Sequence, residues 1–153
     1  MRLEDELMEL DFLKSDSNNV IIEEAKYKKV SKEIYLSLVL DRAICLNCYQ
    51  ALVDKIKSLL SPIKVQRLLI GYKDDLLDEN KYLEYLDKIL EELSQINASY
   101  KAYEAKDAQI DGKNILFLIP KDDLNINNLE LPIKEKFDDY GLDVNIFFKP
   151  DEY

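Results

Sequence analysis

Residues 32–72, KEIYLSLVLDRAICLNCYQALVDKIKSLLSPIKVQRLLIGY, contain the two periodicities that decide the fold. Apolar residues alternate from position 34 to 40, which is typical of a strand with one buried face. That face would carry Ile34, Leu36, Leu38 and Leu40. Apolar residues then recur every three or four positions from Leu46 to Leu60, as on a helix that buries one stripe. Pro62 ends this helix, because the residue before a proline is disfavoured in the α region. The alternation of residues 63–72 predicts a returning strand, so the segment forms a strand–helix–strand unit of the α+β class.

The residues before this segment predict a helix, a loop and the first strand of a β-hairpin. Leucines spaced at three and four residues within 3–13 indicate a short amphipathic helix. Residues 15–19, SDSNN, are typical of a loop whose side chains hydrogen-bond to its own backbone. Residues 20–29 predict a strand with Ile21, Ala25 and Tyr27 on one face, joined by a tight turn to the strand at 34–40.

The same order of elements returns in the second half of the chain. Residues 108–111 and 113–119 flank Asp111-Gly112, a dipeptide preferred in hairpin turns, and they are followed by a helix at 129–140 and a strand at 142–148. Residues 113–119 are apolar on both faces, which predicts a central strand covered on both sides. Between the two copies lies the clearest amphipathic helix, at 79–96.

This repetition predicts an α+β chain of two small ββαβ modules, with mainly antiparallel or mixed sheets and with helices packed on one face. The first module spans residues 1–76. The second spans residues 77–153 and begins with the amphipathic helix, which joins the two.

Composition restricts the function. The net charge of −10 disfavours an autonomous nucleic-acid binder, because affinity for nucleic acid comes largely from neutralised phosphates. A local basic patch of Lys26, Lys28, Lys29 and Lys32 is more simply a solvated sheet edge. No run of about 18 apolar residues predicts a membrane span. Two cysteines without an export signal favour a reducing cytoplasm.

Few residues are candidates for chemistry. The chain has no histidine, the commonest general base and a frequent metal ligand. Cys45-Leu-Asn-Cys48 could be a redox pair, half of a zinc site, or two small hydrophobes one helical turn apart, and the last is the commonest explanation. Residues 122–128 come nearest to a calcium loop but lack its glycine. The sequence therefore predicts no catalytic, cofactor-binding or metal-binding residue, and no cofactor.

Ten tyrosines and no tryptophan suggest one candidate surface. Tyrosine is favoured at protein interfaces because its ring packs while its hydroxyl stays wet. A docking face could therefore contain Tyr82, Tyr85, Tyr100 and Tyr103. The alternative is that these tyrosines are half-buried and cap a small core.

Seven segments carry a resemblance to a known family, and they occur in this order: VII (20–22), IYLSLVLDRAI (34–44), YQALVDKI (49–56), VQRLLIGY (65–72), YLEYLDKILEEL (82–93), DGKNILFLIP (111–120) and DDYGLDVNIFF (138–148). In segment order, length and apolar pattern the chain resembles, from about residue 3 to 149, the N-terminal region of PolC-type DNA polymerase III alpha subunits of low-GC Gram-positive bacteria. The family usually has a proline where Cys45 stands, which favours a variable position there over a redox centre.

The resemblance implies a non-catalytic part of a DNA-directed DNA polymerase, whose polymerase and 3′–5′ exonuclease modules lie elsewhere. The family's first small domain is similar to a polymerase-binding domain of the clamp-loader tau subunit, and its second has been likened to KH folds. Both imply tethering to replisome proteins such as tau, or to single-stranded nucleic acid, and the net charge favours the protein partner. The alternatives are a single-stranded nucleic-acid-binding accessory domain, a small CxxC thiol oxidoreductase and a free-standing adaptor.

Overall fold

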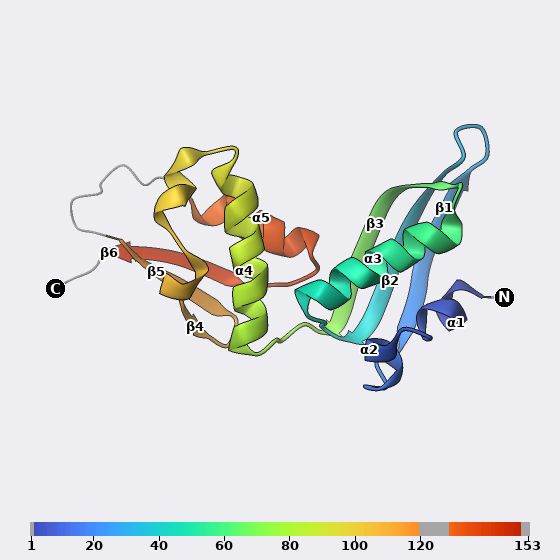
Figure 1. Cartoon of the computed structure of the whole chain (residues 1–153), viewed down its shortest axis with the longest axis horizontal. Coiled ribbons are helices and arrows are strands. Elements are labelled where there is room, and N and C mark those ends of the chain that lie inside the picture. The colour runs from blue at the N-terminus through green and yellow to red at the C-terminus, as the bar shows by residue number, and fades with distance from the viewer. Residues whose placement is uncertain (1, 120–128, 151–153) are drawn as a thin grey trace. The chain divides into compact units, whose positions relative to one another are not determined.

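The computed structural model describes residues 2–119 and 129–150 (Figure 1). The chain divides into two compact units, Met1–Asp75 and Leu76–Tyr153. Each unit contains a three-stranded mixed sheet with helices beside it, so the predicted α+β class with two ββαβ modules is confirmed. Within the described residues, no helix is long and apolar enough to cross a membrane.

The first unit is built from three strands and three helices, which follow one another as α1 (Leu3–Leu7), α2 (Asp11–Lys14), β1 (Val20–Lys28), β2 (Glu33–Arg42), α3 (Leu46–Leu60) and β3 (Lys64–Asp74). Its sheet has the order β1-β2-β3. β2 pairs antiparallel with β1 and parallel with β3, and α3 provides the crossover that a parallel pair requires.

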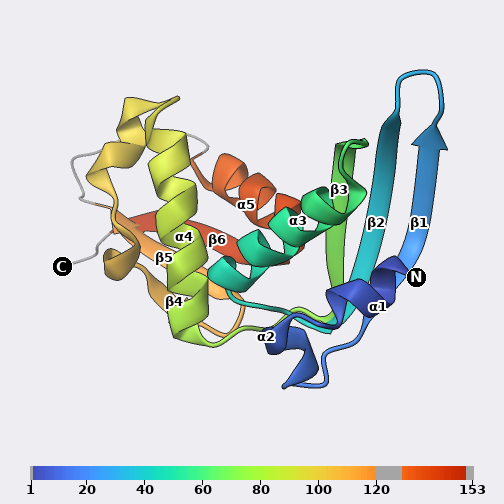
Figure 2. The same ribbon diagram turned by 45° about the vertical axis from the view of Figure 1, so that its right-hand side comes forward.

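One face of this sheet forms the core of the unit. Leu36, Leu38 and Leu40 of β2 are buried there, as the alternation predicts, and they belong to one apolar cluster with Leu52 and Ile56 of α3. Figure 2 shows α1 and α3 on the same side of the sheet. The helices therefore cover one face and leave the other face without a helix from this unit.

A β-bulge corrects the predicted orientation of β1. Ile22 pairs with Leu38 but Glu24 pairs with Ser37, so β1 has one residue more than β2 over this stretch. An extra residue reverses the alternation beyond it. Ile21 therefore lies on the face opposite to Ala25 and Tyr27, and the prediction that all three share a face is wrong.

The N-terminal segment is two short helices instead of the single helix predicted at 3–13. Leu10 leaves the helical region, with φ −65° and ψ 129°, and begins α2 as its N-cap. Helices of four and five residues are marginal alone, and tertiary packing stabilises them. The break allows Leu7 and Leu13 to be fully buried in the core of the unit.

The loop at 15–19 hydrogen-bonds to the end of β2 instead of to its own backbone. The buried Asn18 side chain donates from Nδ2 to the Arg42 carbonyl at 2.8 Å and accepts from the Arg42 N–H at 3.0 Å. Asn19 donates from its backbone N–H and its Nδ2 to the Asp41 carboxylate, at 3.2 and 3.1 Å. The backbone hydrogen bond from Asn19, followed by Lys73, lowers the pKa of Asp41 below its ordinary value. These bonds hold the loop at the end of the sheet.

Replacing Asn18 with alanine is expected to lower the free energy of unfolding by about 2 kcal/mol, because both bonded groups of Arg42 lose their partner in a partly buried position. Asn19→Ala is the matched control, since it removes only the exposed Nδ2 bond to Asp41 and keeps the backbone bond, and it should cost well under half as much. Urea unfolding of the two variants measures the difference, and equal losses would contradict the role given to Asn18.

The second unit contains, in chain order, α4 (Glu79–Ser94), two 3-10 helices η1 (Ala98–Ala102) and η2 (Ala105–Asp107), β4 (Gln109–Asp111), β5 (Asn114–Ile119), α5 (Glu130–Asp139) and β6 (Asn145–Pro150). The sheet order is β4-β5-β6, with an antiparallel and then a parallel pair, as in the first unit. α4 packs against α5, η1 and η2, so it belongs to this unit. Asp78 caps its start by accepting from the Lys81 N–H at 3.0 Å.

β5 is central, as predicted, but only one of its faces is buried. Ile115 and Phe117 lie in the core, while Leu118 on the other face is 43% exposed. The prediction that the strand is covered on both sides is therefore wrong for the described residues. The physical reason is that α4 and α5 both lie on one side of the sheet, as Figure 1 shows.

Candidate functional site

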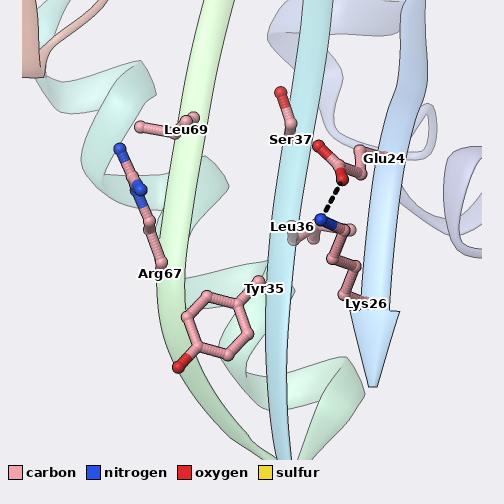
Figure 3. Close-up of a pocket in the computed structure, with 7 residues that line it drawn as sticks. All are labelled: Glu24, Lys26, Tyr35, Leu36, Ser37, Arg67 and Leu69. Atoms are coloured by element: carbon pink, nitrogen blue, oxygen red, sulfur yellow. Dashed lines mark ion pairs between the residues drawn. The ribbon is translucent and has the colours of Figure 1, made fainter. Parts of the chain in front are cut away.

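The open face of the first sheet, opposite to α3, is the candidate site. Strand register places nine residues there in three cross-strand rows: Ile21, Val39 and Gly71; Glu24, Ser37 and Leu69; and Lys26, Tyr35 and Arg67. We call these nine residues the outer face. Figure 3 views its lower two rows, with α3 behind the sheet.

The sequence forms this face through two bulges. The extra residue of β1 brings Glu24 and Lys26 beside Ser37 and Tyr35. A second register shift occurs in β3, where Val65 pairs with Ile34 and Arg67 pairs with Tyr35. Each bulge turns the residues after it to the other side of the sheet. The bulges therefore decide which charges stand beside the apolar residues.

The apolar part of the outer face is exposed. Leu69 is 45% exposed and Ile21 is 43% exposed, and the side chain of Val39 between their strands is half-buried. The strands that carry them are long, with 9 to 11 residues each. Contiguous exposed apolar surface of this kind, bordered by polar residues, is typical of an interaction site.

The charged part of the outer face contains Arg67, a cation for which no ion pair occurs among the described residues. Lys26 forms an ion pair with Glu24 at 3.0 Å, drawn as a dashed line in Figure 3. The Lys28 Nζ atom lies 4.9 Å from the centre of the Tyr35 ring. Arg67 is exposed, and no carboxylate of the described residues pairs with it. An open depression of about 150 Å³ is lined by Glu24, Lys26, Tyr35, Leu36, Ser37, Arg67 and Leu69.

The four lysines of the predicted basic patch separate into two places. Lys26 and Lys28 lie on β1, where the first is paired with Glu24 and the second contacts Tyr35. Lys29 and Lys32 lie in the turn between β1 and β2, beside the fully exposed Val30. The four positive charges are therefore divided between the last residues of β1 and the turn.

Three of the four candidate interface tyrosines are core residues, and this corrects the docking-face interpretation. Tyr82, Tyr85 and Tyr100 are buried. The Tyr82 hydroxyl accepts from the Leu77 N–H at 3.2 Å, and the Tyr100 hydroxyl donates to the Leu129 carbonyl at 2.9 Å. Burial raises the pKa of Tyr100.

Tyr103 is half-buried and packs edge-on against the rings of Phe117 and Phe148, with centroid distances of 5.7 and 5.2 Å. The physical reason for the correction is that these rings fill the core of a small unit, and that the hydroxyl groups of two of them hydrogen-bond to backbone groups of its loops. The four tyrosines therefore form no shared exposed face, because three of them are buried.

The two cysteines stand at the start of α3. Cys45 is the N-cap and its sulfur accepts from the Cys48 N–H at 3.3 Å. The two sulfur atoms are 2.9 Å apart, no disulfide joins them, and both residues are half-buried.

No group of three or more histidine, cysteine, aspartate or glutamate side chains that could hold a metal ion occurs in the described part of the chain. Residues 122–128, the segment that comes nearest to a calcium loop in sequence, lie outside the described residues.

The second sheet also has an uncovered face, on shorter strands and with an open depression of about 500 Å³. It carries Leu116, Leu118 and Phe147 on strands of six residues, and Lys149 lies 5.4 Å from the centre of the Phe147 ring. β4 contributes only three residues. We take the outer face of the first sheet as the candidate because its strands are longer and its exposed apolar residues lie beside Arg67.

Comparison with known proteins identified no relative of this chain. The chain matches no protein-family model, no curated protein and no solved structure.

Proposed function

We propose that this chain is a non-catalytic interaction region of a PolC-type replicative DNA polymerase, and that it docks a replisome protein on the outer face of the first sheet. The clamp-loader tau subunit is the partner we propose. The polymerase and exonuclease activities then belong to other modules of the same longer protein, which acts in the cytoplasm. The proposal assigns no catalytic residue, metal or cofactor to the chain.

The observation that carries the proposal is the combination of exposed apolar residues with a cation that has no ion pair among the described residues. Leu69 and Ile21 offer apolar area whose burial stabilises a complex by about 25 cal/mol per Å². Arg67, two residues before Leu69 on the same face, lacks a carboxylate among the described residues. Arginine is enriched at interface centres because it pairs with carboxylates in two-pronged geometry. The face therefore suits a protein segment that presents apolar side chains beside an acidic one.

Charge favours a protein over single-stranded nucleic acid. The chain carries a net charge of −10, which repels phosphates at long range. KH domains hold nucleic acid with a Gly-x-x-Gly loop, and the three glycines here stand at 71, 112 and 141. The KH likeness of the second module remains a prediction.

The resemblance to the PolC-type N-terminal region is the reason for proposing tau as the partner. The PolC-type N-terminal region precedes the catalytic modules and consists of two small domains, and the present chain consists of two compact α+β units. The likeness of the family's first domain to a polymerase-binding domain of tau is the reason for placing the docking face in the first unit.

Leu69→Asp is expected to weaken binding of the chain to the tau subunit by at least about tenfold, because a charge would enter an apolar contact. Leu118→Asp is the matched control, since Leu118 has almost the same exposure on the uncovered face of the other sheet. Calorimetric titration with tau measures both variants beside the unaltered chain. A parallel titration with single-stranded oligonucleotides at low salt tests the alternative function.

Equal loss of affinity in the two leucine variants would contradict the assignment of the face. Tight, salt-dependent oligonucleotide binding without any binding of tau would contradict the proposed function itself.

A further inference from the structure

We infer that Cys45 and Cys48 form a dithiol–disulfide redox site that exchanges two electrons with small-molecule disulfides. The inference rests on the geometry at the start of α3 and is independent of the docking face, whose residues it does not use.

The first argument is the placement of the two sulfur atoms. They are 2.9 Å apart, and a disulfide bond of about 2.05 Å requires them to approach by about 0.9 Å more. The N-cap position explains the proximity. Cys45 has extended backbone angles, φ −67° and ψ 166°, so its side chain turns back over the first helical turn and meets Cys48 there. The fold therefore brings the two thiols together before any bond forms.

The second argument is that the two thiols are not equivalent. Cys48 lies within the first turn of α3 and packs against the apolar cluster of the first unit. Cys45 lies outside the helix and is not part of that cluster. Both are half-buried, so a small reagent can reach the pair. We assign the first attack to Cys45 and the resolving attack to Cys48.

The reaction balances in two exchange steps. The Cys45 sulfur attacks one sulfur of a small disulfide, RSSR, which forms a mixed disulfide and releases RS⁻ that takes up the proton lost from Cys45. The Cys48 sulfur then attacks the Cys45 sulfur and releases the second thiol in the same way. Overall the two protein thiols are oxidised to one disulfide, and RSSR is reduced to two molecules of RSH.

The test uses the full chain in glutathione buffers of graded ratio, followed by alkylation and mass spectrometry. The native chain should lose both thiols together and regain both with dithiothreitol. It should reach half-oxidation at a lower ratio of oxidised to reduced glutathione than the same chain in urea, because folding holds the sulfurs together. Half-oxidation at the same ratio or a higher one in the folded chain would overturn the proposal.

Two serine variants test the assigned order. Cys48→Ser should accumulate one glutathione on Cys45, whereas Cys45→Ser should accumulate less under the same conditions. Serine is a good N-cap, so Cys45→Ser should keep α3 intact, and circular dichroism checks this. Stable mixed disulfides on both cysteines of the unaltered chain, or disulfides between chains in place of the internal one, would overturn the proposal.

Discussion

Replacing Leu38 with alanine is expected to destabilise the first unit by about 2–5 kcal/mol, the usual cost of truncating a buried leucine. Leu38 lies on the central strand of the first sheet and is buried in its apolar cluster. That cluster draws all its members, including the partly buried ones, from residues 3–72. The loss should therefore concentrate in the first unit.

Hydrogen exchange measured by mass spectrometry reports the two units separately. In Leu38→Ala we expect amides of β1, β2 and α3 to exchange faster while those of α4 and β5 keep their protection. Leu69→Ala is the control, because it removes the same atoms from the exposed face of the same sheet, and its cost should be below about 1 kcal/mol. Equal loss of protection in both units would show that the cores are not separate.

Replacing Phe137 with alanine is the reciprocal experiment, with an expected loss of about 3–5 kcal/mol from the second unit. Phe137 is buried on α5, and its ring meets that of Tyr82 on α4 edge-on, with centroids 6.5 Å apart. Truncation removes both the buried area and an aromatic contact worth about 0.5–1.5 kcal/mol.

The control on the same helix is Leu131→Ala, since Leu131 is exposed, and its effect should be small. The same exchange measurement applies, now with β1, β2 and α3 expected to keep their protection. A Phe137 variant as stable as the Leu131 variant would contradict the core described for the second unit.

The sequence predicts the elements better than their faces. The apolar pattern alone indicates β2 and α3, because these two elements pack against each other. Their contact requires alternating apolar residues at 34–40 and apolar residues every three or four positions from Leu46 to Leu60. The repeated order of elements likewise predicts the second sheet. The apolar pattern cannot predict the register between neighbouring strands, because one strand can contain an extra residue between two paired positions.

The bulge between Ile22 and Glu24 illustrates this limit. One extra residue leaves composition and local propensity unchanged, yet it moves Ile21 to the outer face, away from Ala25 and Tyr27. The candidate site depends on this register and on which face the helices cover, and neither is visible in one sequence. Asn18 is a similar case, because its role depends on its distance from the end of β2.

For the tyrosines, in contrast, the sequence already contains the information that corrects the prediction. Tyr82 and Tyr85 stand on the apolar stripe of α4, and that periodicity already favours burial. The frequency of tyrosine in the chain suggests an interface, but the spacing of these residues is the better indicator. The hydroxyl partners of Tyr82 and Tyr100 lie on loop backbone and could not be predicted from spacing.

The central claim is that the outer face of the first sheet binds a replisome protein. Hydrogen exchange of the unaltered chain, free and saturated with the tau subunit, tests it most directly. We predict new protection in β2 and β3 around Ser37 and Leu69, with little change in β5 and β6. Absence of binding, or protection confined to the second unit, would contradict the account.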